Sequence, residues 1–277
     1  MEFTPITAEQ RRQFTEDGFL IVRKAISQDL VAKLLEAGDR MVATDQQVNR
    51  CPSYDKTTDG FRNVIAMDDA FLPLLMNPTT VPLIVQLFGP RIQLATSHLI
   101  YRLPDPPGKK CKTGWHRDIM HTPDDLGHAH VPRMEVKCAY YLTDLSEPNS
   151  GSTVFAPGSH LLKKYLKIDP ATGNPKNFVE PRLQPGDAVL FENRTFHAAG
   201  PNLSGRTRKA VMFGYSYRWL RPMDYLTQPQ ELVEKVDDIG KQLLCATADP
   251  LGRFIAGGGA EPLIRWCEQH QIHYSAA

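Results

Sequence analysis

Residues 92–103 read Ile-Gln-Leu-Ala-Thr-Ser-His-Leu-Ile-Tyr-Arg-Leu, a run rich in β-branched and aromatic residues that predicts a β-strand. Similar short runs follow along the chain at 134–142, 153–156, 188–191 and 210–217. Turn signals such as Pro148-Asn-Ser-Gly151 and Pro185-Gly-Asp187 separate these runs. The centre of the chain is therefore expected to be an antiparallel β structure of short strands.

Helices are predicted before and after this centre. Residues 7–17 read as a helix capped by Thr7 and stopped at Gly18, and residues 19–22 read as a strand. Ser27 is expected to cap an amphipathic helix, and Gly89-Pro90 to end another over 79–88. Beyond Pro222, helices are expected at 230–244 and 262–270.

This order predicts a mainly β fold with flanking helices, as in a jelly roll or cupin-like barrel packed against helices. We expect a single domain over residues 1–277. In that division, residues 1–90 are mainly a helical flank, residues 91–220 the jelly-roll core, and residues 221–277 the C-terminal helices.

Composition excludes several classes of function. The net charge is +1, from 32 basic and 31 acidic residues, so no basic face for nucleic acid is indicated. The cysteines number five and none has CxxC spacing, which favours reduced thiols in a cytoplasmic protein. The N-terminus has no apolar signal region, and the most apolar stretch, 71–90, is interrupted by polar residues and prolines. We therefore expect no membrane segment.

The motif Trp115-His116-Arg117-Asp118 places a histidine and a carboxylate two positions apart. In extended chain, alternate side chains face the same side, so both can point into a barrel. A further histidine, His197, follows the predicted strand at 188–191. Two histidines and one carboxylate form a facial triad that suits non-haem Fe(II), although zinc hydrolases use the same donor types. Either histidine could instead be a hydrogen-bonded structural residue.

Two arginines, Arg206 and Arg208, lie just beyond His197. A dicarboxylate that chelates iron through its 2-oxo acid end needs a cation for its far carboxylate. The planar guanidinium fork of arginine suits that carboxylate. Both arginines are candidates on this argument, and one of them is expected to be a solvated hairpin residue.

Together these residues resemble the phytanoyl-CoA dioxygenase family. The resemblance rests on the WHRD motif, on Pro157-Gly-Ser-His160, and on His197-Ala-Ala-Gly-Pro-Asn-Leu-Ser204 followed by Arg208-Lys-Ala210. Gly18-Phe-Leu-Ile-Val-Arg23 and Leu87-Phe-Gly-Pro90 are also similar to that family, so that the resemblance spans roughly residues 10–220. It implies a double-stranded β-helix that uses Fe(II), 2-oxoglutarate and O2.

The resemblance also implies roles for particular residues. His116, Asp118 and His197 match the iron ligands, and Arg208 matches the arginine that binds the 2-oxoglutarate carboxylate. Arg102 matches a strand position where family members carry a basic or polar contact to the co-substrate, and Tyr140 matches an aromatic position near it. Thr153 matches, more weakly, a position at the pocket wall. One position departs from the pattern, because Ala199 stands where some relatives have a hydroxyl residue that contacts the co-substrate.

The activity implied by the resemblance is oxidation, most simply hydroxylation, of an aliphatic C–H bond of a small metabolite, with release of succinate and CO2. Desaturation or cyclisation remains an alternative outcome. Halogenating relatives replace the carboxylate ligand with a small residue, so Asp118 favours oxygenation. Competing interpretations are a zinc-dependent hydrolase with the same triad and a non-catalytic jelly-roll binding protein.

Substrate contacts are expected from loops around the barrel. The candidates are His121, Tyr54, Trp219 and Arg221. The partner is expected to be a small-molecule substrate of secondary metabolism, and the protein a monomer or homodimer. No sequence feature identifies the substrate.

Overall fold

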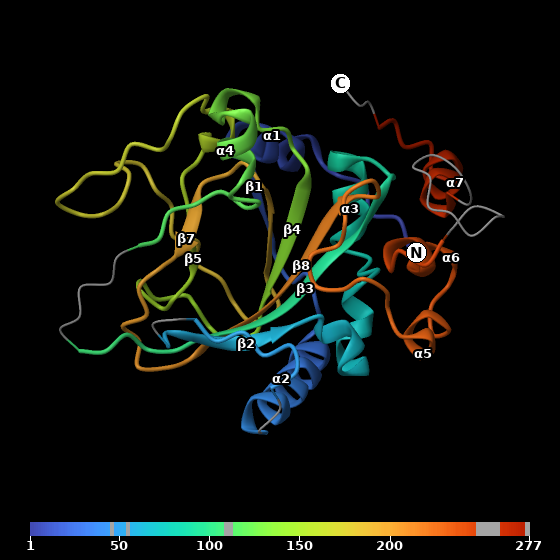
Figure 1. Ribbon diagram of the computed structural model, residues 1–277, viewed down its shortest axis with the longest axis horizontal. Coiled ribbons are helices and arrows are strands. Elements are labelled where there is room, and N and C mark those ends of the chain that lie inside the picture. The colour runs from blue at the N-terminus through green and yellow to red at the C-terminus, as the bar shows by residue number, and fades with distance from the viewer. Residues whose placement is uncertain (45–46, 54–55, 108–112, 248–260, 275–277) are drawn as a thin grey trace.

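The computed structural model describes residues 1–44, 47–53, 56–107, 113–247 and 261–274. Within them, a six-stranded sheet has the order β1-β6-β4-β8-β3-β2, and a smaller sheet pairs β5 with β7 (Figure 1). All these strand pairs are antiparallel. The strands are β1 (Phe19–Val22), β2 (Thr58–Arg62), β3 (Ile92–Arg102), β4 (Glu135–Tyr141), β5 (Thr153–Phe155), β6 (Ala188–Glu192), β7 (His197–Ala199) and β8 (Arg208–Tyr217). The predicted mainly β fold is confirmed.

Helices flank the sheets. They are α1 (Ala8–Asp17), α2 (Gln28–Ala43), α3 (Val81–Phe88), α4 (Thr122–Leu126), α5 (Gln230–Val233), α6 (Asp238–Leu243) and α7 (Pro262–Gln269). Short 3₁₀ turns are η1 (Val64–Ala66), η2 (Asp69–Leu74), η3 (His128–His130) and η4 (Ser159–Leu161). The helix caps confirm the sequence signals: the Thr7 hydroxyl accepts from the amide of Gln10, the Ser27 hydroxyl accepts from that of Leu30, and Gly18 ends α1 in the left-handed region.

The prediction of one helix over residues 230–244 is wrong. The chain forms α5 and then α6, because the Asp237 side chain accepts a hydrogen bond from the amide of Gly240 and starts a new helix.

The N-terminal segment contributes strands as well as helices. Its strands β1 and β2 form the two edges of the large sheet. None of the helices in the described residues is long and apolar enough to cross a bilayer.

The large sheet is covered on both faces. One face packs against helices, where Val136, Cys138 and Tyr140 of β4 share a core with Leu34 of α2 and Val85 of α3. The opposite face looks toward the small sheet, where Ala139 and Tyr141 of β4 lie with Phe155 of β5 in a second core (Figure 1). Because strand residues alternate between faces, β4 sends Glu135, Lys137, Ala139 and Tyr141 into the space between the sheets.

Strand register aligns this inner face in rows. Lys137 of β4 lies opposite Gly214 of β8, which lies opposite Thr96 of β3. A bulge between Leu94 and Thr96 adds one residue to β3. The extra residue reverses which side chains face inward, so that His98, Ile100 and Arg102 point between the sheets and Leu99 and Tyr101 join the helix-side core.

Candidate metal centre

The WHRD motif and His197 are joined directly through their main chains. The amide of His116 donates to the carbonyl of His197, and the amide of His197 donates to the carbonyl of His116, both at 3.0 Å. The amide of Asp118 donates to the carbonyl of Asn193 at 3.0 Å. This pairing brings one donor atom from each of His116, Asp118 and His197 within 4.8 Å of one another. The predicted triad is therefore assembled by backbone pairing at the edge of the small sheet.

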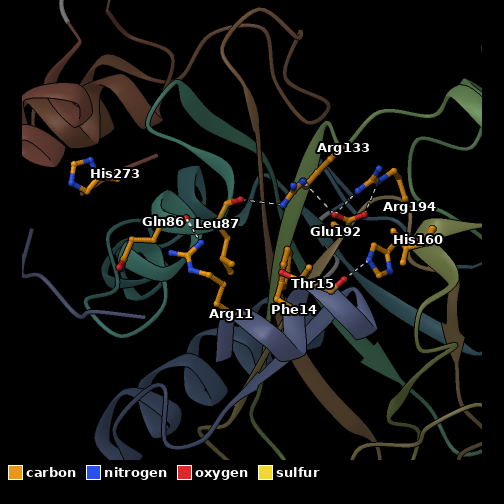
Figure 2. Close-up of a pocket in the computed structure, with 11 residues that line it drawn as sticks. Arg11, Phe14, Thr15, Gln86, Leu87, Arg133, His160, Glu192, Arg194 and His273 are labelled. Carbon is orange, nitrogen blue, oxygen red and sulfur yellow. Dashed lines mark hydrogen bonds and ion pairs between the residues drawn. The ribbon is translucent and has the colours of Figure 1, made fainter. Parts of the chain in front are cut away.

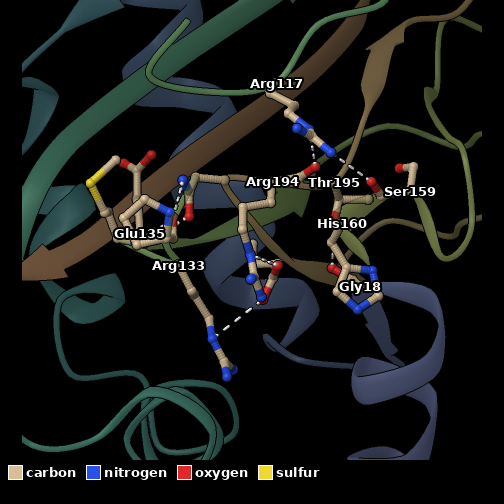
Figure 3. Close-up of polar contacts among 12 residues, drawn as sticks. Gly18, Arg117, Arg133, Glu135, Ser159, His160, Arg194 and Thr195 are labelled. Atoms are coloured by element: carbon tan, nitrogen blue, oxygen red, sulfur yellow. Dashed lines mark hydrogen bonds and ion pairs between the residues drawn. The ribbon is translucent and has the colours of Figure 1, made fainter. Parts of the chain in front are cut away.

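Alternation along the motif places the other two side chains on the opposite side. Trp115 packs in a separate cluster with Val154 and Phe196. The guanidinium of Arg117 lies over the Phe196 ring and donates to the carbonyls of Arg194, Ser159 and Leu162. Figure 3 shows Arg117 beside Arg194 and Ser159. Arg117 thus ties the motif to two neighbouring loops while His116 and Asp118 face inward.

Both histidines present the same nitrogen to the centre. Nδ1 of His116 lies 2.8 Å from the carbonyl of Gly114, and Nδ1 of His197 lies 2.9 Å from that of Thr195. A carbonyl partner requires each Nδ1 to carry the proton, which leaves the Nε2 lone pair free for a metal. Burial lowers the pKa of His197 to about 4, so its imidazole is neutral at pH 7.

Asp118 is held by a residue that the sequence analysis missed. The Lys137 ammonium donates to Oδ1 of Asp118 at 2.7 Å. Burial, the largest single cause, raises the pKa of Asp118, but the charge and hydrogen bond of Lys137, together with the two histidines, outweigh burial and lower this pKa to about 2. Oδ2 is buried, has no hydrogen-bond partner among the described residues, and lies 3.7 Å from Nε2 of His197. Asp118 therefore offers one free anionic oxygen.

These donors fit a divalent metal. Two imidazole nitrogens and one carboxylate oxygen converge, and the carboxylate oxygen lacks the hydrogen bond that a buried anion needs. Ile119, directly after Asp118, has φ of +55°, a conformation that β-branched residues rarely adopt. Strain of this kind persists where the surrounding structure imposes it, often at functional sites.

A cation that has no acidic partner among the described residues lies at the start of β8. Arg208 is buried, its Nε donates to the carbonyl of Gly151, and its Nη1 has no hydrogen-bond partner among the described residues. The hydroxyl of Tyr141 is also buried and unpartnered in this part of the chain, and Tyr141 lies beside Arg208 and Thr153. Burial raises the pKa of Tyr141, so its phenol remains a donor. Two donors without acceptors fit the carboxylate of a bound dicarboxylate.

Tyr140 does not lie on the face of β4 that its predicted role requires, and its neighbour Tyr141 does. Tyr140 faces the helices, and its hydroxyl lies 2.7 Å from Oγ1 of Thr80. Tyr141 faces the space between the sheets. Both tyrosines are fully buried. Since neither face of β4 is exposed at this point, no alternation of polar and apolar residues in the sequence distinguishes the two faces.

Arg102 lies opposite Arg208 in the register, yet its charge is already neutralised. Its guanidinium pairs with Asp105 and donates to the carbonyls of Thr57 and Leu103, which leaves only Nε unpartnered among the described residues. Ala199 pairs with Thr153 across the small sheet. The side chains of Thr153 and Ala199 therefore project from the same face of the small sheet.

The predicted substrate residues are not brought to the triad as a group. The side chain of His121 is 89% exposed and lies 3.7 Å from Asp124. Trp219 stacks on Tyr217 and lines a surface cavity of about 590 Å³ on the helix side of the sheet. Arg221 is exposed, and Tyr54 lies outside the described residues.

None of the triad residues lines a further pocket of about 310 Å³, whose lining residues are drawn in Figure 2. In it Glu192 pairs with Arg133 and Arg194, and Arg133 donates to the carbonyl of Leu87. These contacts join the end of β6 to α3. Because these charged groups are paired with one another within the described chain, we assign the cluster a structural role.

Comparisons with known proteins give a consistent result. A family model described as phytanoyl-CoA dioxygenase (PhyH) matches residues 14–210. The dioxygenase cdmD of Talaromyces verruculosus is 25% identical over 83% of this chain and 80% of that protein. A probable alpha-ketoglutarate-dependent hypophosphite dioxygenase of Stutzerimonas stutzeri is 27% identical over 76% of this chain and 78% of that protein.

Among solved structures, the epimerase SnoN in complex with Fe3+, alpha ketoglutarate and nogalamycin RO has a similar fold, with a TM-score of 0.61. The two chains are 20% identical, and the match covers 91% of this chain and 94% of that chain. At this identity the likeness concerns the fold.

Proposed function

Because the chain belongs to the phytanoyl-CoA dioxygenase family, we propose that it hydroxylates an aliphatic C–H bond of a small-molecule metabolite. The enzyme is a non-haem dioxygenase that depends on Fe(II), 2-oxoglutarate and O2. The observation that carries the assignment to particular residues is the convergence of His116, Asp118 and His197 within 4.8 Å. In this proposal they hold the iron, and Arg208 and Tyr141 bind the far carboxylate of 2-oxoglutarate.

Bound iron supplies the activation of O2, coupled to oxidative decarboxylation of 2-oxoglutarate to succinate and CO2. The residues of this chain supply positioning. Lys137 holds one oxygen of Asp118, so that the other oxygen is directed to the metal. Gly114 and Thr195 hold the two imidazoles in one tautomer through their carbonyls. The surrounding core of Phe155 and Phe191 excludes water from the reacting atoms.

The retained Asp118 supports oxygenation over halogenation, since a halide would need the position that its carboxylate fills. A zinc hydrolase would use the same three donors. It would leave Arg208 and Tyr141 without a role, although both are buried with unsatisfied donors in the described chain. The oxygenase proposal accounts for the triad and for these two donors together.

The matched proteins support only a broad class of substrate. The proteins matched above are named with very different compounds, hypophosphite in one case and bound nogalamycin RO in another. We therefore propose a small metabolite of secondary metabolism rather than a particular acyl-CoA. A monomeric or homodimeric protein with a single oxygenase domain, located in the cytoplasm, is part of the same proposal.

The test is succinate release from 2-oxoglutarate in air, scored over a metabolite panel, with product mass for each active compound. A gain of one oxygen atom supports hydroxylation, and loss of two hydrogens indicates desaturation or cyclisation. Metal analysis and O2 dependence separate the hydrolase alternative, because hydrolysis would continue without O2.

A further inference from the structure

The inner face of the large sheet continues for one row beyond Lys137. In that row Glu135 of β4 lies opposite Ser216 of β8, which lies opposite Gln93 of β3. Along each strand this row is displaced from the Lys137 row toward the end opposite Arg208 and Tyr141. The proposed 2-oxoglutarate site and the Glu135 row therefore lie on opposite sides of the metal centre.

Glu135 is a fully buried carboxylate whose two oxygens accept no hydrogen bond from the described residues. Its position depends on a glycine, because a Cβ atom at Gly214 would lie 2.2 Å from Oε1 of Glu135 and 2.6 Å from Cγ2 of Thr96. Gly214 thus lets the carboxyl group lie across β8 toward β3. Burial, the largest cause, raises the pKa of Glu135 to about 7.

Groups around Glu135 are already engaged. Lys137 donates to Asp118 at 2.7 Å and stays 4.0 Å from Oε2 of Glu135. Arg62 donates to Thr96 and lies 3.5 Å from Asp224. Asp224 in turn accepts from the Thr96 hydroxyl and from the amides of Ser97 and Asn63. The Asp224 carboxylate therefore accepts several hydrogen bonds, whereas the Glu135 carboxylate accepts none from the described residues.

Gln93 also has a buried acceptor oxygen that lacks a partner among the described residues. Its amide nitrogen donates to the carbonyl of Leu220, while its buried Oε1 has no partner among the described residues. The row therefore offers three acceptor oxygens, two from Glu135 and one from Gln93, that the described chain leaves unsatisfied. Unsatisfied buried acceptors are destabilising, most of all on a carboxylate, and a ligand that donates hydrogen bonds relieves the cost.

We propose that Glu135, assisted by Gln93, binds a protonated amino group of the substrate and so fixes the position of the oxidised C–H bond. This inference rests on the proposed oxygenase function and narrows its substrate to an amine-bearing metabolite. An ammonium group fits because it carries only donors and a positive charge, the complement of a carboxylate and an amide oxygen. A neutral alcohol would satisfy one oxygen without balancing the charge.

A surface pocket lies next to residues that contact this row. A pocket of about 470 Å³ is lined by Arg62 and Asp224, together with Cys51 and Met223. Arg62 and Asp224 both contact Thr96, whose methyl group lies beside the Glu135 carboxylate. The Arg62 side chain is 43% exposed. In this proposal the amine reaches Glu135 from this pocket when Arg62 moves away from Thr96.

The test uses three probes of one size: cyclohexylamine, cyclohexanol and cyclohexanecarboxylate. Their binding to the enzyme loaded anaerobically with Fe(II) and 2-oxoglutarate is measured by calorimetry at pH 8. We expect the amine to bind roughly tenfold more tightly than the alcohol or the acid, the size of effect typical of a charge-assisted hydrogen bond. In Glu135→Gln this preference should disappear, and in the exposed control Glu147→Gln it should remain.

Equal affinity of the three probes, no measurable amine binding, or an amine preference that survives in Glu135→Gln would each overturn the proposal. The visible band of the Fe(II)–2-oxoglutarate complex is recorded on the same samples. Loss of that band in the unmodified enzyme would count against the oxygenase function, whereas a normal band with no amine preference would count against the Glu135 site alone. Thermal unfolding of Glu135→Gln verifies that the variant is folded.

Discussion

The ammonium nitrogen of Lys137 lies 2.7 Å from Oδ1 of Asp118, on the side of the carboxylate that faces the large sheet. This contact joins the two sheets at the metal centre, because Lys137 belongs to β4 and Asp118 belongs to the loop paired with Asn193. It leaves Oδ2 as the oxygen available to a metal and fixes its direction. We infer that Lys137 is a positioning residue for the proposed carboxylate ligand.

Replacing Lys137 by methionine should therefore weaken metal binding. Methionine keeps the length of the side chain but removes the donor that orients Asp118. Loss of such an outer contact typically costs ~10–100-fold in metal affinity. The measurement is the dissociation constant for Co(II), obtained by competition with a chelator. The control is Lys209→Met, since Lys209 forms an ion pair with Asp39 away from the triad; equal affinities in the two variants would contradict the positioning role.

Substitutions of Arg208 and Arg102 should have different effects on the KM for 2-oxoglutarate. Arg208→Gln removes a buried cation without an acidic partner in the described chain, so the KM for 2-oxoglutarate should rise by roughly 10–100-fold. Arg102→Gln breaks the pair with Asp105 and should mainly lower the free energy of unfolding. Steady-state kinetics and urea unfolding of both variants make the comparison. A larger KM effect at Arg102 would reverse the assignment.

The adjacent tyrosines of β4 offer a matched pair. Tyr141→Phe removes the unpartnered hydroxyl beside Arg208 and should raise the KM for 2-oxoglutarate by several-fold, about 1 kcal/mol for one hydrogen bond. Tyr140→Phe removes the contact with Thr80 in the helix-side core and should lower stability by a similar amount without changing that KM. If Tyr140→Phe alone changed the KM, the face assignment of β4 would be incorrect.

Glu135 should make the stability of the metal-free protein depend on pH. Its pKa is raised from 4.5 to about 7 on folding, so the folded state binds a proton more tightly than the unfolded state. This contribution is fully present below pH ~4.5 and is lost as the pH rises through about 7. Urea unfolding at pH 5, 6, 7 and 8 should show Glu135→Gln gaining stability relative to the unmodified protein toward high pH. A constant difference across this range would argue against a strained buried carboxylate.

Much of the strand pattern could be predicted from the sequence. The β-branched and aromatic runs at 92–103 and 134–142 correspond to β3 and β4. The spacing of His116 and Asp118 anticipated their common face, since alternation in extended chain is a local property. Their meeting with His197 was predicted by chemistry and resemblance, and the structure supplies the backbone pairing that produces it.

Other features depend on long-range packing. The choice between Tyr140 and Tyr141 required knowledge of which face meets the helices, because β4 is buried on both sides. β2 was missed because residues 58–62, Thr-Asp-Gly-Phe-Arg, carry weak strand propensity and pair only in the context of β3. Lys137 does carry a signal in the sequence, because Glu135 and Lys137 are charges at alternate positions of a strand predicted to be buried.

The most direct test of the central claim is an anaerobic titration of the protein with Fe(II) in the presence of 2-oxoglutarate, followed by visible absorption. The account predicts a weak charge-transfer band that saturates at one iron per chain. The band should be absent in the His116→Ala, Asp118→Ala and His197→Ala variants, each verified as folded by circular dichroism. A band that persists in these folded variants, or no band in the unmodified protein, would contradict the assignment of His116, Asp118 and His197 as the iron ligands.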